Sequence, residues 1–139
     1  ERTLISPKTR FDRFIAGDDL ALSALEQAGF RLFVGKAGCI SCNYGWRLSD
    51  GKVHNIGNAG NNSPDAANGA PRIRTPGLRH IAKTAPYMHD GSLPTLQRVM
   101  AHYLKLRQNQ IALSPNLVRP LRLSDAEKDA LLAFLRTLD

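Results

Sequence analysis

The chain has 139 residues, of which 42% are hydrophobic, and its formal net charge is +7. It is long enough for one domain with a hydrophobic core, and no apolar run approaches the roughly 20 residues that a membrane-spanning helix needs. The basic residues are scattered and no nucleic-acid-binding motif accompanies them, so we expect no nucleic-acid partner and no membrane span. The chain opens on Glu1 without a signal peptide, which predicts a cytoplasmic protein, a processed one or a fragment.

The first predicted element is a helix over residues 18–34. Asp18 or Asp19 is a suitable N-cap, and Gly35 and Gly38 end the helix just before Cys39. Its apolar residues recur at helical spacing, at Leu22, Leu25, Gly29, Leu32 and Phe33.

Residues 44–78 predict an irregular segment. Gly, Asn, Pro and Asp dominate it, and it is too long for an ordinary connection between two elements. A segment of this kind either wraps a flat cofactor or is a disordered insertion.

Two more helices follow, over residues 94–106 and 125–138. Pro94 suits the first turn of the former, and Ser124-Asp125-Ala126-Glu127 is a capping box for the latter. The two apolar faces are Leu96, Val99, Met100 and Tyr103, and Leu131, Phe134, Leu135 and Leu138. Because no segment alternates with period two, we expect a mostly α fold with little or no sheet.

The motif Cys39-Ile-Ser-Cys42-Asn43 carries the most chemistry. Two cysteines at this spacing fit covalent haem attachment, a thioredoxin-like redox pair or half a zinc site. The redox interpretation lacks a preceding strand. The zinc interpretation lacks two further ligands, since the four histidines are not paired at ligand spacing. The haem interpretation lacks its usual histidine, which Asn43 replaces.

The order of helix, C-x-x-C, long loops and two helices resembles a cytochrome c domain. Several segments, in order and over nearly the whole chain, resemble the C-terminal half of the bacterial di-haem cytochrome c peroxidase and MauG family. They are Glu1-Arg2-Thr3-Leu4, Gly35-Lys36-Ala37-Gly38-Cys39, His54-Asn55-Ile56-Gly57, Arg74-Thr75-Pro76-Gly77-Leu78-Arg79, Thr84-Ala85-Pro86-Tyr87-Met88-His89-Asp90-Gly91 and Thr95-Leu96.

The resemblance implies a single cytochrome c-like domain over residues 1–139, with long loops that enclose a covalent haem c. It implies electron transfer in a periplasmic oxidoreductase, with the enzyme's peroxidase or MauG-like chemistry shared with a second haem domain. That N-terminal haem domain is not in this chain, so we expect it as a partner, beside a redox donor protein or a protein substrate.

The resemblance also assigns the haem contacts. Cys39 and Cys42 form the thioethers, and Tyr103 matches the distal iron ligand, with Met88 as second choice. Asn43 stands where the family has its proximal histidine, and a carboxamide is a poor iron ligand beside an imidazole.

Further residues match family positions around the haem. Arg74 and Arg79 are expected at the propionates or on the surface, and His89, like His54, at the haem edge or in loop hydrogen bonds. Backbone oxygens of Thr84 and Pro86 match part of a calcium site between the two domains, which this chain alone would not complete.

Three hypotheses account for Asn43. It is an engineered removal of the ligand, or a natural variant whose haem is ligated from one side or by water. In the third, the domain is degenerate, holds no haem and serves as a structural or docking domain. The retention of both cysteines favours haem.

Overall fold

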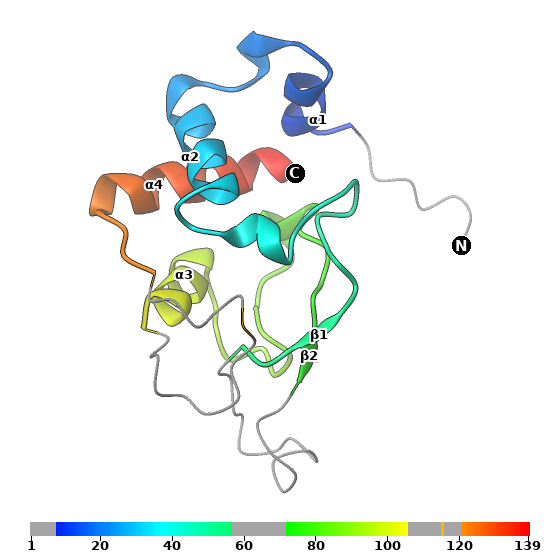
Figure 1. The fold of residues 1–139 in the computed structure, drawn as a ribbon, viewed down its shortest axis with the longest axis vertical. Helices are drawn as coiled ribbons and strands as arrows, with labels where there is room; N and C mark the ends of the chain where they lie inside the picture. The colour runs from blue at the N-terminus through cyan, green and yellow to red at the C-terminus, as the bar shows by residue number, and fades with distance from the viewer. Residues whose placement is uncertain (1–7, 57–71, 106–114, 116–120) are drawn as a thin grey trace, which may run out of the picture.

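The computed structural model describes residues 8–56, 72–105, 115 and 121–139. Within these ranges the longer elements are α1 (Arg10–Ile15), α2 (Ala24–Val34), α3 (Leu96–Lys105) and α4 (Asp125–Leu135), with short 3₁₀ turns between them. The strands β1 (Val53–His54) and β2 (Ile73–Arg74) pair antiparallel, with Val53 opposite Arg74 and His54 opposite Ile73. In Figure 1, α2 lies across α4, and α3 and the β1–β2 pair lie on the other side of α4 from α1. The prediction of a mostly α fold is confirmed.

The first predicted helix, over residues 18–34, is interrupted. Asp18 caps only a 3₁₀ turn, Asp19–Ala21, and Leu22 is extended. The helix proper begins at Ala24, because the Ser23 hydroxyl accepts the backbone N–H of Glu26 while the Glu26 carboxylate accepts that of Ser23. This capping box satisfies the backbone N–H groups of Ser23 and Glu26 and so fixes the N-terminus of the helix at this point. The predicted start at residue 18 was wrong.

The later helices follow the prediction more closely. Ser124 and Glu127 form the expected capping box of α4, which ends at Leu135 in a 3₁₀ turn over Arg136–Leu138. Helix α3 covers Leu96–Lys105, and the predicted end at residue 106 lies outside the described residues. Helix α1 was not predicted, although Thr9 and Asp12 form a capping box there too.

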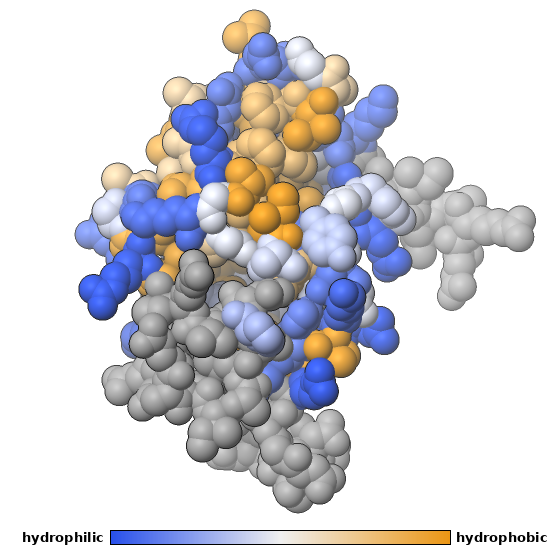
Figure 2. Space-filling view, in the orientation of Figure 1, coloured by the Kyte–Doolittle hydropathy of each residue, from blue (hydrophilic) through white to orange (hydrophobic). Residues whose placement is uncertain are grey.

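All five phenylalanines of the sequence join in one aromatic cluster, which links α1, α2 and α4. Phe134 of α4 is at its centre and fully buried, with ring centroids 5.2–5.4 Å from those of Phe11, Phe30 and Phe33. Tilted and edge-to-face pairs at this distance are favourable. Apolar side chains also reach the surface over the upper, helical part of the molecule in Figure 2. Ile15, Leu20 and Leu25 are among the large apolar residues that are exposed.

Helices α2 and α4 approach each other most closely at Gly29. A Cβ atom at this position would lie 2.0 Å from the carbonyl oxygen of Ala130 and 2.7 Å from Cβ of Phe134. These are backbone and near-backbone atoms, so no side-chain rotation relieves the clash. The absence of a side chain at residue 29 is therefore a requirement of the helix crossing.

We predict that Gly29→Ala destabilises the protein. Helix propensity alone predicts a gain of about 1 kcal/mol for this change, whereas overpacking at the crossing costs about 1–3 kcal/mol or more. Urea denaturation measures the sign. Arg31→Ala, an exposed position of the same helix, is the control and should change the free energy of unfolding by no more than about 0.5 kcal/mol. A more stable Gly29→Ala protein would contradict the packing described here.

Candidate haem attachment site

The C-x-x-C motif lies on a 3₁₀ turn, Cys39–Ser41, which three residues separate from Gly35, the C-cap of α2. Gly38 precedes it in the left-handed conformation, at φ 64°, which glycine adopts at little cost. The Cys39 carbonyl then accepts three hydrogen bonds: from the backbone N–H groups of Cys42 and Asn43, and from the Asn43 side-chain amide at 3.1 Å. The carboxamide of Asn43 is thereby held within the turn.

Neither cysteine is in a disulfide, and both residues are partly exposed. Cys39 packs against the hydrophobic core, and burial, with a contribution from the neighbouring Cys42, raises the pKa of its thiol to about 11. The Cys42 sulfur lies 3.9 Å from the hydroxyl oxygen of Ser41. Two reduced thiols on one turn are the groups that thioether attachment of a haem requires.

Tyr103 of α3 lies beside both cysteines. Burial, and then the charge that either thiolate would carry, raise the pKa of its phenol to about 12. The contribution of both sulfurs places the phenol within electrostatic range of the two cysteines. Its ring also stands edge-on to that of His102, with centroids 5.4 Å apart, and His102 Nε2 contacts the carbonyl oxygen of Ile56 at 2.8 Å.

These residues fit a covalent haem only in part, because the thiols and the phenol suit it and the carboxamide of Asn43 does not. Two thiols and a phenol come together from α3 and the turn after α2, as the sequence places them, but the position that an imidazole would occupy holds a hydrogen-bonded carboxamide. A haem at this place would find two attachment points and one candidate oxygen ligand, without a strong nitrogen donor from Asn43.

The predicted propionate partners already have protein partners. Arg79 makes a bidentate ion pair with Asp12 of α1, at 2.8 and 2.9 Å, and its Nε donates to the Trp46 carbonyl. Arg74 is exposed on β2 and donates to the carbonyl of Gly51 at 2.6 Å. Of the two guanidinium groups, that of Arg74 is therefore the more accessible, and it has further N–H groups to donate.

The other predicted residues lie in the loop before α3. Met88 is half-buried with a positive φ of 70°, and its carbonyl accepts the N–H of Gly91. His89 is exposed. Thr84 and Pro86 are exposed as well, and the Thr84 hydroxyl donates to Ile81. A calcium site that uses their backbone oxygens stays a prediction.

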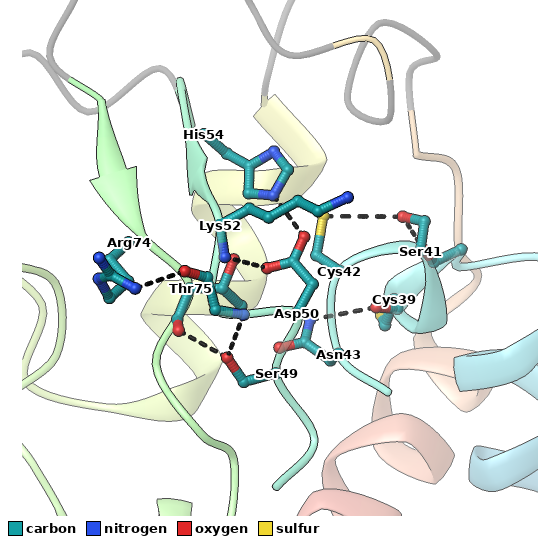
Figure 3. A network of polar contacts seen from close by, with 12 residues as sticks. Cys39, Ser41, Cys42, Asn43, Ser49, Asp50, Lys52, His54, Arg74 and Thr75 are labelled. Atoms are coloured by element: carbon teal, nitrogen blue, oxygen red, sulfur yellow. Dashed lines mark hydrogen bonds and ion pairs between the residues drawn. The ribbon is translucent and has the colours of Figure 1, made fainter. Parts of the chain in front are cut away.

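A polar network next to Cys42 was missed in the sequence (Figure 3). Asp50 Oδ2 lies 2.7 Å from His54 Nε2, and the Asp50 backbone N–H donates to the Cys42 carbonyl. Burial alone would raise the pKa of Asp50, but hydrogen bonds from His54, from the Lys52 backbone and from Thr75 outweigh it and lower this pKa to about 2. The available signal was the four-residue spacing of Asp50 and His54.

No protein-family model matches the chain. Among curated proteins it is 40% identical over 146 residues to the methylamine utilization protein MauG of Methylorubrum extorquens, which covers 99% of this chain. It is 35% identical over 172 residues to the cytochrome-c peroxidase IdrP2 of Denitromonas iodatirespirans, again over 99% of this chain. The solved structure of a MauG-like protein associated with microbial copper homeostasis superposes with a TM-score of 0.79 at 31% identity, over 94% of this chain.

The chain belongs to the MauG and di-haem cytochrome c peroxidase family. The diheme peroxidase BthA of Burkholderia thailandensis has the same fold, with a TM-score of 0.72 at 21% identity. This family member spans 41% of the Methylorubrum protein and 46% of the Denitromonas protein. Haem of the c type is the cofactor that membership implies. In the described residues, no helix is long and apolar enough to cross a membrane.

We predict that the Asp12–Arg79 pair fixes α1 to the segment around Trp46. Asp12→Asn should lower the free energy of unfolding at pH 7 by about 1.5–3 kcal/mol, the range for hydrogen bonds to charged groups. The guanidinium of Arg79 holds the pKa of Asp12 well below its usual value. The stabilisation is therefore complete above the unfolded pKa of about 3.9 and is lost as the pH falls below it.

Denaturation of wild type and Asp12→Asn at pH 7 and at pH 3 measures this contribution, and the difference between the two proteins should shrink at pH 3. Asp129→Asn, an exposed aspartate of α4, is the matched control. An equal effect of both substitutions would show that the ion pair contributes nothing specific.

Proposed function

We propose that this chain is the electron-transferring c-type haem domain of a periplasmic di-haem oxidoreductase of the cytochrome c peroxidase and MauG type. The observation that supports the proposal is that two cysteines outside any disulfide lie within electrostatic range of the Tyr103 phenol. A bound haem would supply the one-electron chemistry of its iron. The chain itself would supply the attachment, one ligand and the surroundings.

Each group has a separate part in this proposal. Cys39 and Cys42 hold the cofactor covalently, so that it stays in place in either oxidation state. Tyr103 presents a buried phenol oxygen to one side, with Met88 as the second choice of ligand. Arg74 and His89 offer polar contacts at the surface, whereas Arg79 would reach a propionate only by leaving Asp12.

The partner in this proposal is a second haem domain, the N-terminal one of the same protein or a separate chain. The segment beside the cysteines has the composition of a contact surface, since Ile40, Tyr44 and Trp46 are all exposed, Trp46 by 75%. The Arg47 guanidinium lies 5.6 Å above the Trp46 ring. Aromatic residues and arginine are enriched at protein interfaces. The electron donor and the final substrate, peroxide or protein, belong to the whole enzyme.

One observation favours a second candidate, a haem-free structural or docking domain. The side chain of Asn43 is hydrogen-bonded within the turn, where an iron-ligating imidazole would have to point outward. In this alternative the two cysteines stay reduced and the domain contributes only its surface.

Covalent attachment is the first test. The chain should be exported to the periplasm of a bacterium that has a cytochrome c maturation system. We expect a protein mass increased by one haem, and haem that stays with the protein in acidified organic solvent. The double variant Cys39→Ala and Cys42→Ala, and wild type retained in the cytoplasm, should both lack it. A mass equal to the bare exported chain would favour the haem-free alternative.

The axial ligands are the second test. In the haem-loaded chain, Tyr103→Phe should change the visible spectrum, and Asn43→His should produce a low-spin spectrum, because an imidazole is a stronger iron ligand than a carboxamide. The matched control is Tyr87→Phe, since the Tyr87 hydroxyl donates to Ile81 within the core. It should cost about 1 kcal/mol of stability and leave the spectrum unchanged. An unchanged spectrum in Tyr103→Phe would make Tyr103 a core residue only.

A further inference from the structure

Three metal-binding side chains meet beside the attachment turn. Cys42, Asp50 and His54 each direct one donor atom to a common point, and these atoms all lie within 4.8 Å of one another. The side chains of Asp50 and His54 are only 3% and 14% exposed. Figure 3 shows the three converging from the end of the turn, the following loop and β1. In the described residues, this group of sulfur, oxygen and nitrogen donors has the composition of a metal site.

The loop that carries Asp50 is held on several sides. Its carboxylate accepts the backbone N–H of Lys52 at 2.9 Å, and the backbone N–H of Asp50 donates to Cys42 at 2.8 Å. The Ser49 hydroxyl donates to the Thr75 carbonyl at 2.7 Å, which joins the loop to the end of β2. The antiparallel β1–β2 pair fixes His54 in turn. The donors are therefore positioned by backbone structure before any ion binds.

The donor set selects a class of ion. One thiolate, one carboxylate and one imidazole suit zinc and similar borderline divalent cations, while calcium and magnesium prefer oxygen ligands throughout. Three protein ligands leave a fourth tetrahedral position for water. Around one zinc ion, with bonds of about 2.0–2.3 Å, donors lie roughly 3.3–3.8 Å apart. Binding thus requires the Asp50–His54 contact to open slightly and the sulfur to move inward.

We propose that the haem-free chain binds one zinc-class divalent cation through Cys42 Sγ, one carboxylate oxygen of Asp50 and a ring nitrogen of His54. The Cys42 thiol loses its proton to solvent as the metal–sulfur bond forms, and His54 binds through a ring nitrogen that carries no proton.

This site goes beyond the proposed function and does not depend on it. A thioether at Cys42 consumes the same sulfur as a thiolate ligand, so the ion and covalent haem exclude each other at this residue. In the haem-free chain the ion would hold the thiol and join the turn to β1. If no haem is ever attached, the metal site still stands or fails by its own test.

The test uses the 139-residue chain produced in reduced form without haem and titrated with Co²⁺, which reports its ligands by absorption. We expect one ion per chain, a thiolate-to-cobalt charge-transfer band, tetrahedral d–d bands and displacement by Zn²⁺. Cys42→Ser should remove the charge-transfer band, and Asp50→Asn and His54→Gln should each weaken binding at least tenfold. The control Cys39→Ser should bind like wild type.

Two results would overturn the proposal. One is loss of binding in Cys39→Ser with full binding in His54→Gln, which would indicate a pair of cysteines as the site. The other is that the wild-type chain binds no stoichiometric Co²⁺, whether or not its circular dichroism spectrum shows a folded protein. If the variants fail to fold, zinc-edge X-ray absorption on the wild-type chain tests the site without them. It should find one sulfur at about 2.3 Å with nitrogen and oxygen at about 2.0 Å, and a shell without sulfur would refute the site.

Discussion

The close crossing of α2 and α4 is the constraint on which the rest of the described structure depends. At Gly29 the backbone of one helix rests against the carbonyl of Ala130 and the Cβ atom of Phe134 in the other. This proximity brings Phe134 among the aromatic rings of α1 and α2 and completes the core. Because α2 cannot shift along α4 without a steric clash, its end is fixed. The turn with both cysteines follows from that fixed end.

The site uses the two sides of this arrangement differently. Cys39 faces the packed helices, and burial keeps its thiol protonated. Cys42 faces the polar loop, and its sulfur lies within 4.8 Å of donor atoms of Asp50 and His54. Two chemically identical residues, separated by two positions, thus have unequal surroundings. The carboxamide of Asn43, next to Cys42, donates to the Cys39 carbonyl and so closes the turn.

The sequence predicted what depends on local pattern. The capping box at Ser124, the buried stripe of α4 and the haem-type cysteine spacing all follow from residues a few positions apart. The same rule would have located the start of α2, since Ser23 and Glu26 have the spacing of Ser124 and Glu127. The prediction instead placed the N-cap at Asp18 or Asp19. Helix α1 has six residues, too few for a periodic pattern. The Asp12–Arg79 pair joins residues 67 positions apart, which no local rule encodes, whereas the four-residue spacing of Asp50 and His54 was a local signal that the sequence-based prediction did not use.

The exposure of Trp46 has a practical consequence. It is the single tryptophan of the chain, four residues beyond Cys42, and three-quarters of its surface faces solvent. Its fluorescence therefore comes from one known place beside the attachment turn. A porphyrin held by the cysteines would absorb at the wavelengths where this indole emits and would quench it by energy transfer. Emission intensity alone would then distinguish loaded from unloaded molecules in a mixture, without separation or chemical labelling.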